Sequence, residues 1–175
     1  ADGQIEDIEV LANGDLVVGG YFYYAGTVYA SRIARWDGSN WSAVGGGAND
    51  FVRALQQTPN GDLFAGGRFS TVGSAIVMNF GRWNGTSWSA PTLGVGGLGG
   101  ANAPVNVATV LPNGDLVVVG PFTTIGGIAA NHIARWNGST WSPLGSWIGE
   151  HVFAVTHMPN GDVIVGGSFT VANGA

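Results

Sequence analysis

A ten-residue segment recurs four times along this chain, and this repetition constrains the fold more than any other feature. Its copies read NGDLVVGGYF at residues 13–22, NGDLFAGGRF at 60–69, NGDLVVVGPF at 113–122 and NGDVIVGGSF at 160–169. The copies begin 47, 53 and 47 residues apart, and the longer middle interval contains the glycine-rich segment GVGGLGGANAP. A period of this length indicates an array of similar structural units.

A second segment accompanies the first three copies. An Arg-Trp pair begins 22 residues after each Asn-Gly-Asp, and a further Trp follows it, as in IARWDGSNWSAVG from residue 33. We treat the chain as one unit over residues 1–175, with repeats at 1–47, 48–100 and 101–147 and a half repeat at 148–175. Because the extra residues of the second repeat fall in one glycine-rich place, that place is predicted to be a loop.

Each repeat predicts four β-strands and no helix. The Asn-Gly between two apolar runs is a hairpin signal, because its tight turn needs positive φ. The strand after this turn is apolar on consecutive residues, which predicts that both of its faces are covered. The Arg-Trp pair and the following Trp lie in a third and a fourth strand, and no segment has apolar residues at a helical period. The chain is therefore predicted to be all-β.

Four-stranded antiparallel units of this size describe the blades of a β-propeller. The units resemble kelch-type blades, in which a glycine doublet ends the second strand and a Trp lies in the fourth. They are also similar to the Gly-Gly-x-Phe repeats of large secreted bacterial proteins. The resemblance covers the whole chain and implies about three and a half kelch-like blades, although Val119 replaces the first glycine of the third doublet. The intact doublets are Gly19–Gly20, Gly66–Gly67 and Gly166–Gly167.

The residues that recur in every repeat are interpreted as scaffold. The glycine doublet lets a strand lie close to the neighbouring blade, leaving room for a Trp ring over the gap. The Phe of the first segment is expected in the core between blades. The Asp of each turn is expected to accept hydrogen bonds from loop amides and to pair with the Arg of the third strand. These residues are Phe22, Phe69, Phe122 and Phe169, Asp15, Asp62, Asp115 and Asp162, and Arg35, Arg82 and Arg135.

The composition argues against several classes of function. The chain has a net charge of −5 and no Lys, whereas binding of nucleic acid needs a basic stripe. No apolar run approaches the roughly 18 residues of a membrane-spanning helix, so no membrane insertion is expected. The chain also has no Cys, so it cannot build the Cys-dependent cofactor of the copper radical oxidase found among kelch-type propellers. Its three His show no paired spacing for a metal, and we expect neither a metal nor a cofactor.

Catalysis has a weaker basis in the sequence than binding. Asp50 and Glu150 occupy the same position in two repeats, and a pair of carboxylates can act as general acid and base on a glycosidic bond. These two residues lie two blades apart, and no nucleophile or phosphate-binding motif accompanies them. The chain is therefore predicted not to be an enzyme, with a part in a carbohydrate-active enzyme as the alternative.

The variable loops are predicted to gather on one face of the blades. The second-to-third loops and the connections between blades lie opposite the short turns, and binding residues generally lie on such loops. Glu6, Arg53, Asn106 and Phe153 occupy one position in four repeats with four different chemistries. Tyrosines beside Asn, Asp and Arg form a surface suited to a sugar. The predicted ligand-binding residues are Tyr24, Tyr29, Asp50, Arg53, Asn106, Glu150 and His151.

The predicted function is a non-catalytic binding or scaffolding segment of a secreted bacterial propeller that recognises a glycan or a protein surface. An acidic, Lys-free composition rich in Gly, Ser, Thr and Asn favours an extracellular or cell-surface location. The alternative is a purely structural repeat of an extracellular assembly. In that case the same loops form an ordinary solvated rim, because isolated exposed aromatic side chains are common on protein surfaces.

Four copies of the first segment and three of the second predict an open arc that ends with half a blade. Propellers usually contain about 4–8 blades and hide their edges by closing the circle, whereas exposed strand edges invite pairing with another chain. The missing strands are expected to come from the rest of a longer propeller or from another copy of this chain. A lone chain is not expected to be a stable monomer.

Overall fold

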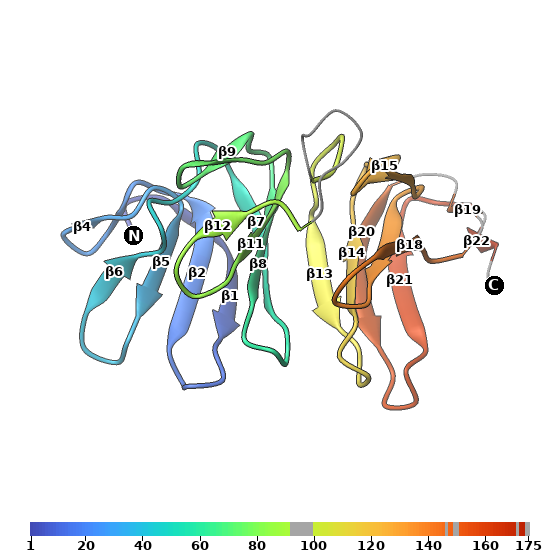
Figure 1. Ribbon diagram of the computed structural model, residues 1–175, viewed down its shortest axis with the longest axis horizontal. Coiled ribbons are helices and arrows are strands. Elements are labelled where there is room, and N and C mark those ends of the chain that lie inside the picture. Colours follow the sequence, from blue (N-terminus) through green and yellow to red (C-terminus); the bar gives the residue numbers. More distant parts are fainter. Residues whose placement is uncertain (92–99, 146, 149–150, 171, 174–175) are drawn as a thin grey trace.

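The computed structural model describes residues 1–91, 100–145, 147–148, 151–170 and 172–173, and β-strands form its framework (Figure 1). The described residues form no helix, as predicted, and none of them forms a helix able to cross a membrane. Three four-stranded antiparallel sheets follow one another along the chain, and a two-stranded sheet comes after them. We number these four sheets as blades 1 to 4.

The strands of each full blade are ordered as they occur in the chain. Blade 1 contains β1 (Gln4–Val10), β2 (Leu16–Tyr21), β5 (Ile33–Trp36) and β6 (Trp41–Ala43). Blade 2 contains β7 (Val52–Gln57), β8 (Leu63–Gly67), β11 (Phe80–Trp83) and β12 (Trp88–Ser89). Blade 3 contains β13 (Val107–Val110), β14 (Leu116–Val119), β17 (Ile133–Trp136) and β18 (Trp141–Pro143). The half blade contains β20 (Val152–His157) and β21 (Val163–Gly167).

The first strands of successive blades lie beside one another. β1 contacts β7, β7 contacts β13, and β13 contacts β20. The remaining strands of each blade extend outward from this inner row, so the blades form an open arc (Figure 1). Four-stranded antiparallel sheets that share an inner row of first strands are the blades of a β-propeller, and the predicted fold class is confirmed.

Short hairpins that the sequence reading did not anticipate lie in the loops between the second and third strands. Each has two-residue strands joined by a turn that contains glycine, such as Gly26, Gly73 or Gly126, and all three lie along the upper edge of Figure 1. We call this the upper face and the opposite one, with the Asn-Gly-Asp turns, the lower face. The hairpins are β3 (Tyr24–Ala25) with β4 (Val28–Tyr29), β9 (Thr71–Val72) with β10 (Ala75–Ile76), and β15 (Thr124–Ile125) with β16 (Ile128–Ala129). A further pair joins β19 (Trp147–Ile148) to β22 (Ala172–Asn173).

The Asn-Gly-Asp turns differ from the two-residue turn that Asn-Gly predicts. In blade 1 the N–H of Gly14 donates to the carbonyl of Leu11, and the N–H of Leu11 donates to the carbonyl of Asp15, both at 2.8 Å. Gly14 has a φ of 88°, whereas Asn13 has no positive φ. The loop therefore has three residues, and only its glycine enters the left-handed region.

The glycine doublets allow close approach in two directions. A Cβ at Gly19 would lie 2.7 Å from Cγ1 of Val52 in blade 2, and one at Gly66 would lie 2.7 Å from Cγ1 of Val105 in blade 3. A Cβ on the second glycine, Gly20, would instead collide with the carbonyl oxygen of Gln4 in the same blade. The first glycine thus sets the spacing between blades, and the second accommodates the inner strand.

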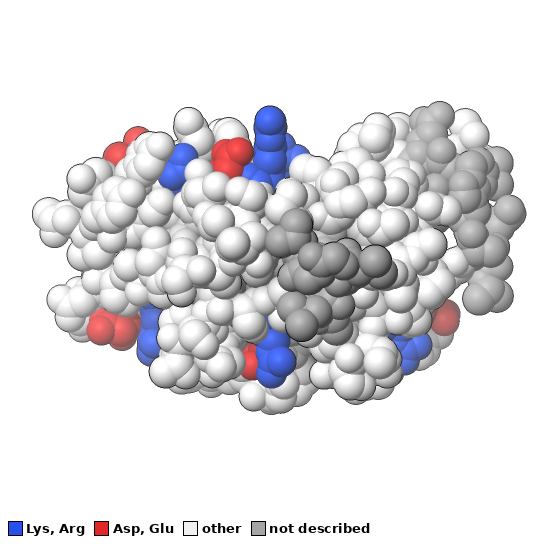
Figure 2. Space-filling model, turned by 45° about the horizontal axis from the view of Figure 1, so that its top comes forward, with Lys and Arg blue, Asp and Glu red and all other residues white. Residues whose placement is uncertain are grey.

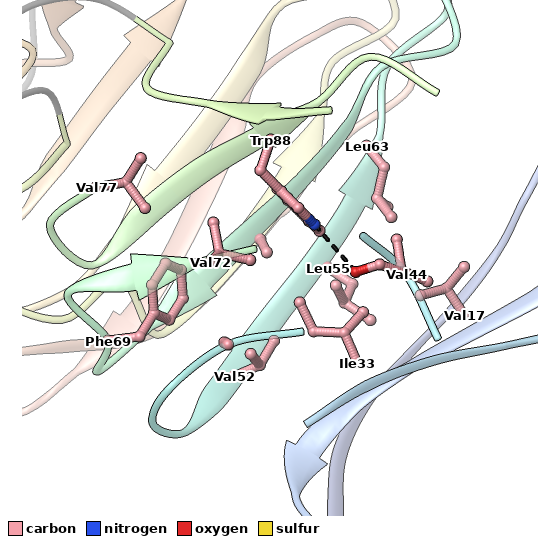
Figure 3. Close-up of a cluster of buried hydrophobic side chains, with 12 residues drawn as sticks. Val17, Ile33, Val44, Val52, Leu55, Leu63, Phe69, Val72, Val77 and Trp88 are labelled. Atoms are coloured by element: carbon pink, nitrogen blue, oxygen red, sulfur yellow. Dashed lines mark hydrogen bonds between the residues drawn. The ribbon is translucent and has the colours of Figure 1, made fainter. Parts of the chain in front are cut away.

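Aliphatic side chains lie nearest to the first glycine of the doublets of blades 1 and 2, where a Trp ring was expected. Trp88 lies in the apolar cluster between blades 1 and 2, and its indole N–H donates to the carbonyl of Val44 at 3.1 Å (Figure 3). A Cβ on Gly73, in the small hairpin, would lie 3.1 Å from the Trp88 ring. The valine and leucine of the next inner strand, Val52 and Leu55, fill the space beside Gly19 instead.

The recurring Phe side chains only partly follow the prediction that they form the core between blades. Phe69 and Phe122 lie in the clusters shared by blades 1 and 2 and by blades 2 and 3. Phe169 packs against the cluster shared by blades 3 and 4. Phe22 is buried within blade 1, among residues of its own second and third strands and its own hairpin.

The predicted pairing of the turn Asp with the third-strand Arg is confirmed in all three full blades. Arg35 Nε donates to Asp15 at 2.6 Å, Nη2 of Arg82 lies 2.6 Å from Oδ2 of Asp62, and Arg135 pairs with Asp115. The amide that each Asp accepts belongs to the preceding Asn side chain, as at 2.9 Å from Asn13 to Asp15. Asn, Asp and Arg thus tie each lower turn to the third strand.

Candidate functional site

The inner strands line a concave cavity of about 500 Å³. It contains one residue from the same position of each of four repeats, so the variable position noted in the sequence faces one shared space. The side chain of Phe153 is 58% exposed there, so an aromatic ring faces solvent beside charged and amide groups. The four residues are Glu6, Arg53, Asn106 and Phe153.

Arg53 and Asn106 are brought together by the structure. Nη1 of Arg53 donates to Oδ1 of Asn106 at 2.9 Å, which joins β7 of blade 2 to the segment just before β13 of blade 3. Asn106 is neutral, so it orients the guanidinium without cancelling its charge, and the remaining N–H groups of Arg53 suit an acceptor in the cavity.

Two other carboxylates of the cavity connect blades 1 and 2. Oδ2 of Asp7 accepts the N–H of Leu55 at 2.7 Å. Oε1 of Glu9 accepts the N–H of Gln57 at 2.7 Å and the side-chain amide of Gln56 at 3.0 Å. Partial burial raises the pKa of Glu9, the nearby Asp7 adds to this rise, and the two hydrogen bonds oppose it. These contacts give Asp7 and Glu9 a structural role.

Tyrosines form a second group on the upper face of blade 1. The Tyr23 and Tyr29 rings stack with centroids 6.3 Å apart, and Tyr24 meets Tyr29 edge-on at 5.4 Å. Their exposed fractions of 45–56% show that these rings do not form part of a core. Tyr21 stacks on Phe51 with centroids 4.2 Å apart, which extends the aromatic surface to the entrance of blade 2.

A buried arginine supports this aromatic group. Cζ of Arg32 lies 4.3 Å from the ring centroid of Tyr23 and 5.1 Å from that of Tyr21, and its Nη2 donates to the Tyr23 hydroxyl at 3.1 Å. Arg32 is 4% exposed and has a φ of 74°, which is uncommon outside glycine and costs energy that the surroundings must offset. Asn79 and His132, at the same position of blades 2 and 3, also have positive φ.

Asp2 holds the base of the tyrosine hairpin. Its Oδ1 accepts the N–H groups of Tyr23 and Tyr24, both at 2.9 Å, and the bond from Tyr24 is the main reason that the pKa of Asp2 lies below its ordinary value. Asn49 and Asn102 make the same pair of contacts in blades 2 and 3.

The other predicted ligand-binding residues lie in separate groups. Asp50 forms an ion pair with Arg68 at 3.8 Å. The His151 ring lies 6.1 Å from that of His132 and 6.2 Å from that of Phe153, between centroids. Glu150 lies outside the described residues, so the distance between Asp50 and Glu150 is not defined. The described members of the predicted set therefore do not form one site: Tyr24 and Tyr29 lie in the blade 1 hairpin, Arg53 and Asn106 line the inner cavity, and Asp50 lies in an ion pair apart from both.

Sequence reasoning missed Tyr21, Arg32, Phe51 and Asp2 as parts of this surface. Asp2 has a sequence signal, because an Asp or Asn stands 11 residues before each of the first three Asn-Gly-Asp turns. Arg32 has a weaker one, because its position holds Arg, Asn and His in three otherwise similar repeats. Stacking of Tyr21 on Phe51 brings together residues 30 apart in sequence and depends on how blades 1 and 2 pack.

The fold, the inner cavity and the tyrosine group of the upper face define a β-propeller segment with an aromatic and polar surface. A family model described as "Domain of unknown function (DUF5122) beta-propeller" matches residues 11–38 and 111–139. No curated protein sequence matches the chain. A solved structure titled "YCF48 bound to D1 peptide" is similar at 22% sequence identity and a TM-score of 0.48, over 93% of this chain and 47% of that one. The present chain thus spans about half of that protein's length.

Proposed function

We propose that this chain is a non-catalytic binding module that recognises a glycan on its upper face. The observation that carries the proposal is the exposed tyrosine group of blade 1. Tyr23, Tyr24 and Tyr29 correspond to Ser70, Thr71 and Ile76 in blade 2 and to Thr123, Thr124 and Ala129 in blade 3.

The chemistry of this surface favours sugars. Tyrosine offers an apolar ring face and a hydroxyl at its edge, which together match the C–H and O–H faces of a pyranose. The aromatic rings are held by Arg32 and by contacts with one another, which lowers the entropy lost when a ligand binds. Charged side chains are sparse on the face that Figure 2 brings forward, as expected from a chain with 10% charged residues.

A binding role is preferred to catalysis for a specific reason. Asp50, the candidate acid or base within the described chain, is paired with the solvent-exposed guanidinium of Arg68, an arrangement typical of a surface ion pair. No group of three or more His, Cys, Asp or Glu suited to a metal occurs among the described residues. We also propose that this propeller is kelch-like and belongs to a secreted bacterial protein.

The side faces of the arc support a structural alternative. Ile5 occupies the position of Val52 and Val105, which are completely buried between blades, but it is 41% exposed. At the other side, a Cβ on Gly166 would meet, among the described residues, only Ala154 at 3.8 Å, whereas Gly19 and Gly66 face a neighbouring blade. We propose that these faces pack against further blades, from the rest of a longer propeller or from a second copy.

The test is a glycan array probed with the assembled protein, followed by titration of any hit. A Tyr24→Ala, Tyr29→Ala double variant should weaken binding by about ten-fold or more, because stacked aromatic rings contribute on the order of 1–3 kcal/mol. Ile76→Ala, at the matching position of blade 2 and 64% exposed, is the control. Arg53→Ala tests whether the inner cavity also contributes to the affinity for that glycan.

Three outcomes would contradict the proposal. Unchanged affinity in both the double tyrosine variant and Arg53→Ala would place the ligand elsewhere. A folded, assembled protein that binds no glycan would favour the structural alternative. Turnover of a glycan that is lost in Asp50→Asn would identify an enzyme.

A further inference from the structure

A second pocket lies on the lower face, between blades 1 and 2, away from the tyrosine hairpin. It has a volume of about 300 Å³, at the lower end of the range for small-molecule sites. Its wall in blade 2 includes the indole of Trp83, at the end of β11, and its wall in blade 1 includes Val17, Arg35 and Ser42.

The repeat supplies an internal comparison for this pocket. The matching pocket between blades 2 and 3 has a volume of about 220 Å³ and contains Phe64 at the position of Val17 and Trp136 at the position of Trp83. Trp136 is 4% exposed and packs in one cluster with Phe64, whereas Trp83 is only partly buried. The pocket with the valine thus has a partly buried Trp ring, and the smaller pocket with the phenylalanine has a buried one.

The charge of the pocket favours a neutral ligand. Arg35 is the single charged residue that lines it, and Asp15 pairs with this guanidinium through both Nε and Nη2. Nη1 of Arg35 and the hydroxyl of Ser42 offer hydrogen-bond donors, and the Ser42 oxygen is also an acceptor.

We propose that this pocket binds a neutral pyranose ring, stacked on Trp83, with its hydroxyls bonded by Arg35 and Ser42. An aromatic surface beside a few directed polar groups, without net charge, matches a sugar ring that has an apolar face and a hydroxyl-bearing edge. The site is independent of the tyrosine group, since the two lie on opposite faces and share no residue. Blade 1 would thus present sugar-binding surfaces at both ends.

The experiment is a titration of the folded, ¹⁵N-labelled protein with the methyl α-pyranosides of glucose, galactose and mannose, observed through the indole N–H signals. Trp83→Phe assigns the Trp83 signal. We expect at least one pyranoside to shift the Trp83 signal with saturation and to leave the Trp136 signal in place. The Tyr24→Ala, Tyr29→Ala variant should respond in the same way, which separates this site from the upper face.

Val17→Phe is the decisive variant, because it places in blade 1 the phenylalanine that blade 2 has at the matching position, Phe64. Val17→Phe should weaken pyranoside binding by about ten-fold or more. Phe64→Val should make the Trp136 signal shift when a pyranoside is added. Ser42 is exposed on the pocket wall, so Ser42→Tyr should also block the pocket and weaken binding without altering the core. No response of Trp83 to any of the three pyranosides, or unchanged affinity in folded Val17→Phe and Ser42→Tyr, would overturn the proposal. A Trp83 response to benzoate but to none of the pyranosides would also overturn it.

Discussion

Val52 packs against the bare α-carbon of Gly19 across the interface between blades 1 and 2. A Cβ at Gly19 would lie 2.7 Å from Cγ1 of Val52 and 3.2 Å from Cδ1 of Leu55. The same relationship joins Gly66 to Val105 between blades 2 and 3. In blade 3 the corresponding residue is Val119, which packs with Val152 in the cluster between blades 3 and 4. The blades therefore approach one another through a repeated contact whose details vary along the arc.

The first prediction concerns this contact. Gly19→Ala should lower the free energy of unfolding by about 1–3 kcal/mol, the usual cost of overpacking a close-packed interior. Gly166→Ala, on the side face of the half blade, should change it by less than about 0.5 kcal/mol in the unassembled chain. Urea denaturation of both variants provides the measurement. Equal effects would show that the doublet acts within its own blade and not through the neighbouring one.

The second prediction compares two turn carboxylates. Asp115 is 8% exposed and accepts from both Asn113 and Arg135, whereas the exposed Asp162 of the half blade accepts from Asn160 and pairs with no Arg among the described residues. Asp115→Ala should cost about 1–3 kcal/mol, because it leaves buried polar groups without a partner. Asp162→Ala should cost less than about 0.5 kcal/mol. Thermal unfolding measures the loss of stability in each of the two variants. Similar losses in both would show that the Asn–Asp contact, and not the Arg pair, supplies the stability.

The third prediction concerns pH. Burial raises the pKa of Glu9 above its ordinary value of 4.5, so the folded state holds this proton more tightly than the unfolded state. The stability that protonated Glu9 contributes is fully present below its pKa in the unfolded chain, and it is lost as the pH rises through its pKa in the folded protein. Glu9→Gln keeps an oxygen acceptor for Gln56 and Gln57 without the charge. It should therefore become more stable relative to the wild type as the pH rises above 4.5.

Denaturation of the wild type and of Glu9→Gln at a series of pH values tests this prediction. Glu6→Gln, at an exposed position of the same strand, controls for the loss of one negative charge. A stability difference that does not vary with pH, or that varies equally for Glu6→Gln, would contradict the assignment to Glu9.

The fourth prediction concerns the base of the tyrosine hairpin. Asp2→Ala removes the acceptor for the N–H groups of Tyr23 and Tyr24, and their hydrogen exchange should accelerate by about five-fold or more. Asp2→Asn should preserve slow exchange, because Asn49 and Asn102 make the same contacts in blades 2 and 3. Exchange that is unchanged in Asp2→Ala would show that the hairpin is held by other contacts.

Much of the blade was accessible from sequence because its signals are local. Asn-Gly, the consecutive apolar run and the Arg-Trp pair each describe a few adjacent residues, and their repetition revealed the order of strands within a blade. The pairing of Asp15 with Arg35 was also predictable, since these residues recur at constant spacing on strands that pair directly. The three-residue turn around Gly14 was not, because Asn-Gly is compatible with more than one loop length.

The candidate sites required the tertiary structure. No local pattern distinguishes Tyr24, which is exposed, from Trp88, which is buried between blades. The stacking of Tyr21 on Phe51 and the bond from Arg53 to Asn106 join residues of different blades. The position of Trp88 also depends on how the blades pack, since its partner Val44 belongs to the preceding blade.

The amino-acid sequence alone was enough to predict that this chain is all-β, that its unit is a four-stranded blade, and that it forms three such blades and half of another. Strand formation and turn geometry depend on neighbouring residues, and a repeat contains the same local pattern several times. Which side chains face solvent, which fill the space between blades, and where cavities remain depend on how the blades pack in three dimensions. Val17 and Phe64 illustrate the physical reason: both are apolar residues of a second strand at the same position of the repeat, but the pocket lined by Val17 has a volume of about 300 Å³ and the pocket lined by Phe64 one of about 220 Å³.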